Sequence, residues 1–219
     1  AISLCRQKRF HEVLEKCRYT SLDDEEEYSI DVIQPEKIEF KQNSYEDGEN
    51  SIISFPEFLL LVLDVCTGGE QPASHYQPDK LIEKFDALKT YFTAGEFYEK
   101  MLYYRLLLDY YTIRRDIKDG QGNYSLILKG PKDDSDKLKQ YQSMLYVSTE
   151  AFYNWLKPYL RKLEQDELHS CAEMLAFLKK EDNERHSILP ARKDLSYKAS
   201  GNIRYWFWRL DYYLWEQRS

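Results

Sequence analysis

Basic and aromatic residues are interleaved near the carboxy-terminal end of the sequence. Of the patterns in this sequence, this one most clearly suggests a binding function. Between Arg185 and Arg209 there are six lysines or arginines and one acidic residue, with tyrosines and tryptophans between them. Basic side chains bind phosphates and aromatic rings stack on bases, so this segment could contact nucleic acid. The alternative is a polar loop that leads into an amphipathic helix whose tryptophans belong to the core. The candidate DNA contacts are Arg192, Lys193, Lys198, Arg204 and Trp208.

The sequence offers no recognisable catalytic or cofactor site. It contains neither of the glycine-rich loops that cradle phosphates, nor the G-x-S-x-G turn that carries a nucleophilic serine. The four histidines are isolated from one another, and the four cysteines contain no C-x-x-C pair. We therefore expect no catalytic residues, no metal site and no cofactor. The isolated cysteines are typical of free thiols in the reducing cytoplasm.

Length and charge limit the possible partners. The chain has 219 residues and a formal net charge of −7, so any contact with DNA must come from a local basic patch. No apolar run approaches the roughly 20 residues that cross a bilayer, and no signal peptide opens the sequence. We expect a cytoplasmic protein without membrane contact. The first residue is Ala1 rather than methionine, which suggests a fragment.

Two helix starts are marked by capping signals. Ser54 with Glu57 and Thr93 with Glu96 have the spacing of a capping box, in which each side chain bonds the backbone N–H of the other residue. The first helix should end at the glycine pair 68–69.

The second of these helices should run from Thr93 to about Asp116. Apolar residues lie on nearly all of its faces, which predicts a buried central helix. Arg105 and Asp109 are one turn apart and should form an ion pair within it. Arg114 and Arg115 would then stand at its carboxy-terminal end, where the helix dipole favours positive charge.

The remaining pattern predicts a mostly α, multi-helix domain with at most a few short strands. We expect helices over 3–18, 134–147, 149–164, 167–181 and 202–217, a weak strand pair or extended loop over 30–40, and a strand over 124–129. Pro158 should kink or split the helix that contains it. Polar turn residues at 41–50 suggest a boundary between an N-terminal part, 1–51, and a helical domain, 52–219. In the last helix Ile203, Phe207, Leu210 and Leu214 should face the core, with Trp206 more buried than Trp208.

Six segments occur in an order that resembles one known family. They are "SFPEFLLLVL" (54–63), "LIEKFD" (81–86), "MLYYRLLLDYYTIRR" (101–115), "LKQYQSMLYVST" (138–149), "WLKPYL" (155–160) and "RYWFWRLDYYLWE" (204–216). Together they resemble the helical middle region of GmrSD-type restriction proteins, the modification-dependent DNA endonucleases of bacterial phage defence. The resemblance covers roughly residues 52–217 and rests mainly on apolar and aromatic packing positions.

The resemblance implies a non-catalytic fragment of a larger enzyme. Members of the family have a ParB-like nucleotide domain with an Asp-Gly-Gln-Gln-Arg motif, then the helical region, then an HNH-type nuclease. "DGQGN" (119–123) lacks the second glutamine and the arginine of the first motif. "RHSILP" (185–190) with "SGNI" (200–203) lacks the second nuclease histidine. We therefore expect no enzymatic activity from this chain itself.

Two classes of function stay open at this point. The chain could be a scaffold or DNA-contact region between the nucleotide and nuclease domains of the parent protein. It could instead be a protein-interaction or oligomerisation module, including a homo-oligomer, whose aromatic surface meets another subunit.

Overall fold

The computed structural model describes residues 48–117, 123–131, 135–148, 150–188 and 203–218. Within these residues it contains seven α-helices and one three-stranded sheet, so the predicted mostly α fold is confirmed. The predicted helix at 3–18 and the segment at 30–40 lie outside the described residues, as do Arg192, Lys193 and Lys198.

The elements follow one another with short connections. They are β1 (Gly48–Ser51), α2 (Phe55–Cys66), the 3₁₀ turns η3 (Ala73–Tyr76) and η4 (Pro78–Lys80), α3 (Leu81–Leu88), α4 (Ala94–Tyr111), β2 (Ile113–Ile117), β3 (Tyr124–Leu128), α5 (Ser135–Val147), α6 (Phe152–Glu164), α7 (Cys171–Arg185) and α8 (Ile203–Glu216).

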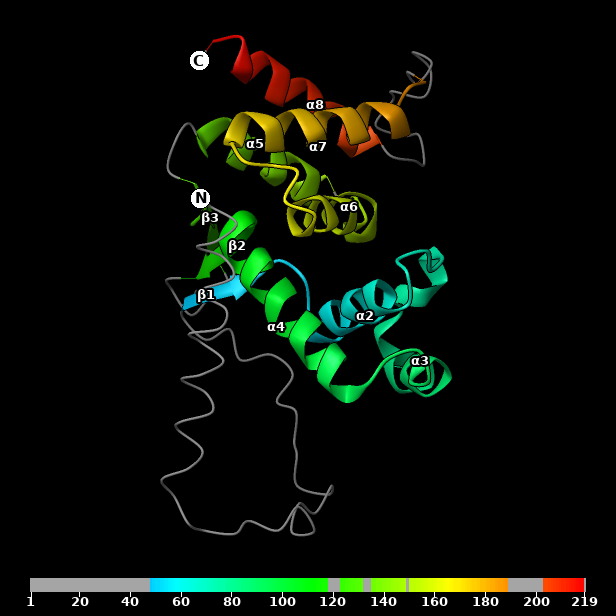
Figure 1. The fold of residues 1–219 in the computed structure, drawn as a ribbon. Coiled ribbons are helices and arrows are strands. Elements are labelled where there is room, and N and C mark those ends of the chain that lie inside the picture. The colour runs from blue at the N-terminus through cyan, green and yellow to red at the C-terminus, as the bar shows by residue number, and fades with distance from the viewer. Residues whose placement is uncertain (1–47, 118–122, 132–134, 149, 189–202, 219) are drawn as a thin grey trace, which may run out of the picture.

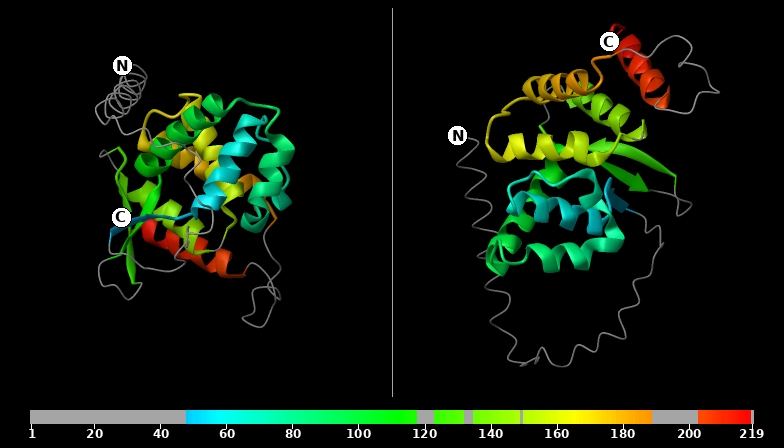
Figure 2. Two further views of the ribbon diagram at one scale, coloured as in Figure 1. Left: turned by 90° about the horizontal axis from the view of Figure 1, so that it is seen from below. Right: turned by 90° about the vertical axis from the view of Figure 1, so that its right-hand side faces the viewer.

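The helices are stacked, with α3 at one end and α8 at the other (Figures 1 and 2). Helix α6 lies in the middle of the stack, where it packs against α4 on one side and α7 on the other. Helix α8 packs against α5 and forms the outermost layer (Figure 1). The small sheet lies beside α4 and α5, in the antiparallel order β1-β2-β3.

Both predicted helix caps are confirmed. The side-chain oxygens of Ser54 and Thr93 accept hydrogen bonds from the backbone N–H three residues later, at 3.4 and 3.2 Å. In each box the glutamate returns a bond to the backbone of the cap, at 2.8 and 2.7 Å. A third box begins α7 at Ser170, so this helix starts four residues later than its apolar pattern predicted.

The central helix ends earlier than predicted. Helix α4 stops at Tyr111, and Thr112 has the extended backbone angles φ −119° and ψ 158°. The buried side chain of Gln142 explains the change of direction. Its amide nitrogen donates to the carbonyl of Tyr111 at 3.0 Å, and its oxygen accepts from the N–H of Ile113 at 2.9 Å. A glutamine from α5 therefore holds this backbone as a neighbouring strand would.

Arg114 and Arg115 consequently lie in strand β2 and not at a helix end, which corrects the prediction for them. Strand β2 is the middle strand, with Ser51 of β1 opposite Arg114 on one side and Leu128 of β3 opposite Ile113 on the other. The predicted strand at 124–129 is confirmed as β3. Strand β1 begins in the segment that we expected to be a polar turn, and it ends at Ser51, the last residue of the predicted N-terminal part.

Three further expectations need correction or refinement. Helix α4 is buried on only one side, because Leu102, Leu106 and Tyr110 are exposed on the other. Arg105 and Asp109 form the predicted ion pair at 2.8 Å, but both side chains are partly exposed. Pro158 lies inside an uninterrupted α6, so it does not split the helix.

We expect the Gln142→Leu variant to unfold about 1–3 kcal/mol more easily than the wild type, because it leaves the buried N–H of Ile113 without an acceptor. Urea unfolding followed by tryptophan fluorescence measures the change. Gln140→Leu is the matched control on the exposed face of α5 and should be nearly neutral. Equal stability of the two variants would contradict the bridging role of Gln142.

Candidate functional site

The two DNA-contact candidates that the structure describes lie together on the outside of α8. Arg204 and Trp208 are one helical turn apart, and both side chains are exposed. Leu210, Asp211 and Leu214 are also exposed on this helix. These five residues form the outer face of α8.

Two arginines of the basic segment point inward instead. Arg209 donates from Nη1 to the hydroxyl of Tyr205 at 2.8 Å and lies over the Trp206 ring at 5.4 Å from its centre. Arg185 donates to the carbonyl oxygen of Asn154 at 2.6 Å. The structure therefore divides the basic segment, because Arg185 binds the neighbouring helix α6 and Arg209 lies along the inner side of its own helix.

One buried carboxylate of α7 contacts the inner side of α8. Asp182 of α7 is fully buried and accepts hydrogen bonds from Tyr141 of α5 and Tyr205 of α8, each at 2.7 Å. Arg209 lies 3.9 Å from the same carboxylate. We call these four residues the Asp182 network. It joins three helices at one point.

The network also shows why the predicted buried face of α8 is wrong. Leu210 and Leu214 are 53% and 44% exposed, whereas Tyr205 and Tyr212 are buried. A buried tyrosine contributes a large apolar ring and a hydroxyl that needs a partner. Tyr205 finds this partner in Asp182, and Tyr212 finds it in Glu216 at 3.0 Å. The helix has turned its tyrosines inward and its leucines outward.

The electrostatics of the network keep both tyrosines protonated. Burial, together with the neighbouring Asp182 carboxylate, raises the pKa of Tyr141 and of Tyr205 well above the ordinary value. Both hydroxyls therefore remain hydrogen-bond donors at neutral pH. A buried carboxylate without such donors would be strongly unfavourable, so each hydroxyl offsets part of the cost of burying Asp182.

His186 lies at the edge of the same network and closes the end of α7. Its ring stacks on Tyr205 with 3.9 Å between ring centres, and its Nε2 is 3.5 Å from a carboxylate oxygen of Glu150. The Nε2 atom is buried without a hydrogen bond. This histidine therefore packs between the end of α7, helix α8 and the residue Glu150 just before α6.

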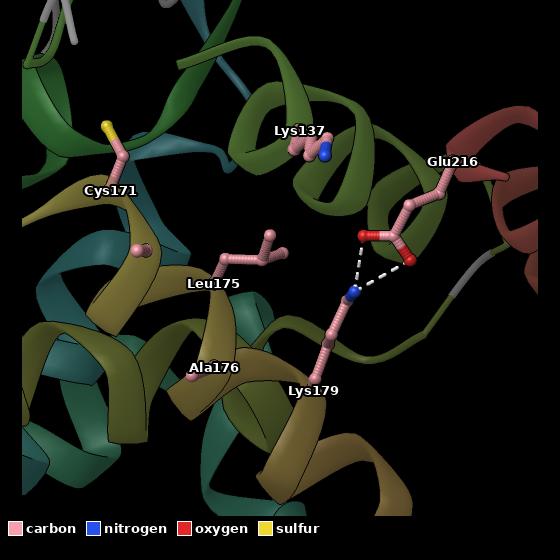
Figure 3. Close-up of a pocket in the computed structure, with 7 residues that line it drawn as sticks. Lys137, Cys171, Leu175, Ala176, Lys179 and Glu216 are labelled. Carbon is pink, nitrogen blue, oxygen red and sulfur yellow. Dashed lines mark hydrogen bonds and ion pairs between the residues drawn. The ribbon is translucent and has the colours of Figure 1, made fainter. Parts of the chain in front are cut away.

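A cavity of about 330 Å³ opens between α5, α7 and α8 (Figure 3). Lys179 crosses it from α7 and forms an ion pair with Glu216 of α8 at 2.6 Å. Although burial acts in the opposite direction, hydrogen bonds from Lys179 and Tyr212 hold the pKa of Glu216 below its ordinary value. Lys179 and Glu216 therefore neutralise each other at the cavity.

A second buried carboxylate connects helices α2 and α6. Asp64 of α2 is fully buried, and it accepts hydrogen bonds from the hydroxyl of Tyr76 and from Lys157 of α6, the latter at 2.9 Å. His75 lies beside it, with Nε2 3.0 Å from the carbonyl oxygen of Leu60 and Nδ1 without a partner. Burial lowers the pKa of His75. The imidazole is therefore neutral in the folded protein at neutral pH.

Neither buried carboxylate was anticipated from the sequence. Asp182 stands in the charged run "KKEDNERH" (179–186), which reads as a solvated helix face. The only available signal was the count of 19 tyrosines, since many buried hydroxyls require buried acceptors.

Comparison with known proteins leaves the family open. No family model matches the chain, and no curated protein and no solved structure is significantly similar to it. Within the described residues, no group of three or more His, Cys, Asp or Glu side chains is arranged to hold a metal ion. None of the described helices has the length and apolar character needed to span a bilayer.

Replacing Tyr205 with Phe should lower the free energy of unfolding by about 1.5–3 kcal/mol, because the buried Asp182 loses a hydrogen-bond donor. Tyr213→Phe, on the same helix, is the control, since no hydrogen bond of its hydroxyl to another described residue is found. Chemical denaturation of both variants tests the difference. Equal losses would mean that the hydroxyl of Tyr205 contributes nothing specific.

His75 should make stability depend on pH. Its folded-state pKa lies below the ordinary value of about 6.5, so below that pH the unfolded chain takes up a proton that the folded chain does not. The free energy of unfolding should therefore fall as the pH drops below about 6.5, by at most about 1.4 kcal/mol per pH unit. The difference between wild type and His75→Gln, measured from pH 8 to pH 5, isolates this effect. A difference that does not change with pH would refute it.

Proposed function

We propose that this chain is a non-catalytic helical scaffold of a bacterial, cytoplasmic anti-phage restriction protein, and that it holds a neighbouring domain of that protein against the outer face of α8. The resemblance to GmrSD-type proteins supplies the class of protein. The observation that carries the scaffold role is the exposed apolar surface on the outer face of α8.

The composition of this face favours a protein partner. Trp208, Leu210 and Leu214 are 44%, 53% and 44% exposed, and they lie on an outermost helix that is firmly held from within. Aromatic and aliphatic side chains form the centres of protein interfaces. The charges of Arg204 and Asp211 have opposite signs, so the face carries no net positive charge to attract phosphates.

DNA contact is the second candidate, and one observation favours it. Arg204 and Trp208 are exposed one turn apart at the beginning of α8, so a guanidinium and an indole are presented together. A guanidinium can bind a phosphate while an indole stacks on a base. Arg185 and Arg209 do not strengthen this surface, because Arg185 donates to Asn154 of α6 and Arg209 lies beside the buried carboxylate of Asp182 in α7.

Phage protection by the complete restriction protein tests the scaffold proposal. Leu214→Asp places a charge in the docking face and should abolish most of the protection, raising plaque counts at least about tenfold by loss of a buried interface contact. The melting temperature should barely change, because Leu214 is exposed. Ile82→Asp, at an exposed position of α3, is the matched control. Unchanged protection with Leu214→Asp would contradict the proposal.

Binding to duplex DNA separates the two candidates. The fluorescence anisotropy of labelled duplexes, with and without modified cytosine, is measured with this chain between 50 and 200 mM salt. The protein-docking proposal expects no salt-sensitive binding. Binding that weakens with salt, with a logarithmic slope that falls by about 0.9 in Arg204→Ala, would favour DNA contact instead.

A further inference from the structure

A continuous apolar ridge runs along the outward side of α4. Tyr98, Leu102, Leu106 and Tyr110 follow one another at intervals of four residues and are 61%, 39%, 46% and 44% exposed. Residues at this spacing form one row on a helix, and this row is about 18 Å long. Exposed apolar patches of this kind mark sites of interaction.

The charges at one end of this α4 ridge are negative. Glu96 and Glu99 are exposed in the first two turns of the helix, at the Tyr98 end of the ridge. Hydrogen bonds from Thr93 lower the pKa of Glu96, so this group is ionised at neutral pH. Farther along, Arg105 and Asp109 neutralise each other. The ridge therefore favours a partner that is apolar on one side and basic around it.

The sequence of the chain itself contains such a partner before β1. Phe10, Val13, Leu14 and Cys17 have the spacing i, i+3, i+4, i+7 of an amphipathic helix. Residues 3–18 carry five lysines or arginines and two glutamates, so the segment is basic where the ridge is acidic. This segment lies outside the described residues.

The chain is long enough to bring this segment to the ridge. The described part begins at Gly48, which pairs with Ile117 in β2, and β2 follows α4 after a single residue. Residues 19–47 could span up to about 95 Å when extended, several times the length of the ridge. A tethered segment also reaches its site at a high effective concentration, which favours it over a separate molecule.

We propose that residues 3–18 form an amphipathic helix that covers the α4 ridge of the same chain. The proposal is independent of the function assigned to α8. It makes the N-terminal segment part of the helical domain, because that segment supplies the apolar surface that α4 lacks on its outer side.

Photocrosslinking in the full chain tests this directly. Leu106 is replaced with the photoreactive amino acid p-benzoylphenylalanine, and ¹⁴N-labelled and ¹⁵N-labelled chains are mixed before irradiation. We expect crosslinks from position 106 to peptides of residues 3–18 that carry the same isotope label. The same amino acid at position 214, on the outer face of α8, should give no such crosslink. Crosslinks between differently labelled chains, or none to residues 3–18, would overturn the proposal.

Two charge substitutions sharpen the test. Leu14→Asp places a carboxylate in the apolar stripe and should reduce the crosslink yield at least about fivefold, while the far-ultraviolet circular dichroism of the folded domain is retained. Leu4→Asp introduces the same charge on the far side of the predicted helix and should leave the yield near its original level. If both substitutions reduced the yield equally, the apolar stripe would not be the docking surface, and the proposal would fail.

Discussion

Carboxylates held by tyrosine hydroxyls between helices are the interaction on which this structure depends. Asp182 receives two such bonds and joins α5, α7 and α8, while Asp64 receives one and joins α2 to α6 with the help of Lys157. Glu164 of α6 repeats the pattern by accepting from Tyr104 of α4 at 2.6 Å. Removing any of these hydroxyls takes a hydrogen-bond donor from a carboxylate that joins two elements, so these contacts help to fix which faces of the helices meet.

This dependence explains which features could be predicted from the sequence. The caps at Ser54 and Thr93 involve residues three positions apart, and both were predicted correctly. The end of α4 depends on Gln142, 31 residues after Tyr111, and apolar periodicity contains no trace of that contact. The buried face of α8 was assigned wrongly for a related reason. Hydrophobicity alone predicts that Leu210 is buried rather than Tyr205. Tyr205 is buried instead because its hydroxyl donates to Asp182.

The candidate site was likewise predictable only in its local features. Composition identified a basic and aromatic segment, and the described part of it does place Arg204 and Trp208 on one exposed surface. Composition could not separate these residues from Arg185 and Arg209, because the direction of an arginine side chain depends on what lies beneath the helix. Asn154 of α6 lies beside Arg185, and Asp182 of α7 lies beside Arg209, so both guanidinium groups turn toward the interior.

The same contacts between helices limit which polar side chains of the described residues are available to a substrate. Groups that often act in catalysis, such as Asp64, Asp182 and Lys157, are held in contacts between helices. A carboxylate that is saturated by donors and sealed from water is poorly placed to exchange protons with a substrate. The described exposed surface, by contrast, has apolar rows on α4 and on α8, at separate places in the stack (Figure 1). An interior joined by these contacts, together with apolar outer faces, supports the proposed scaffold role.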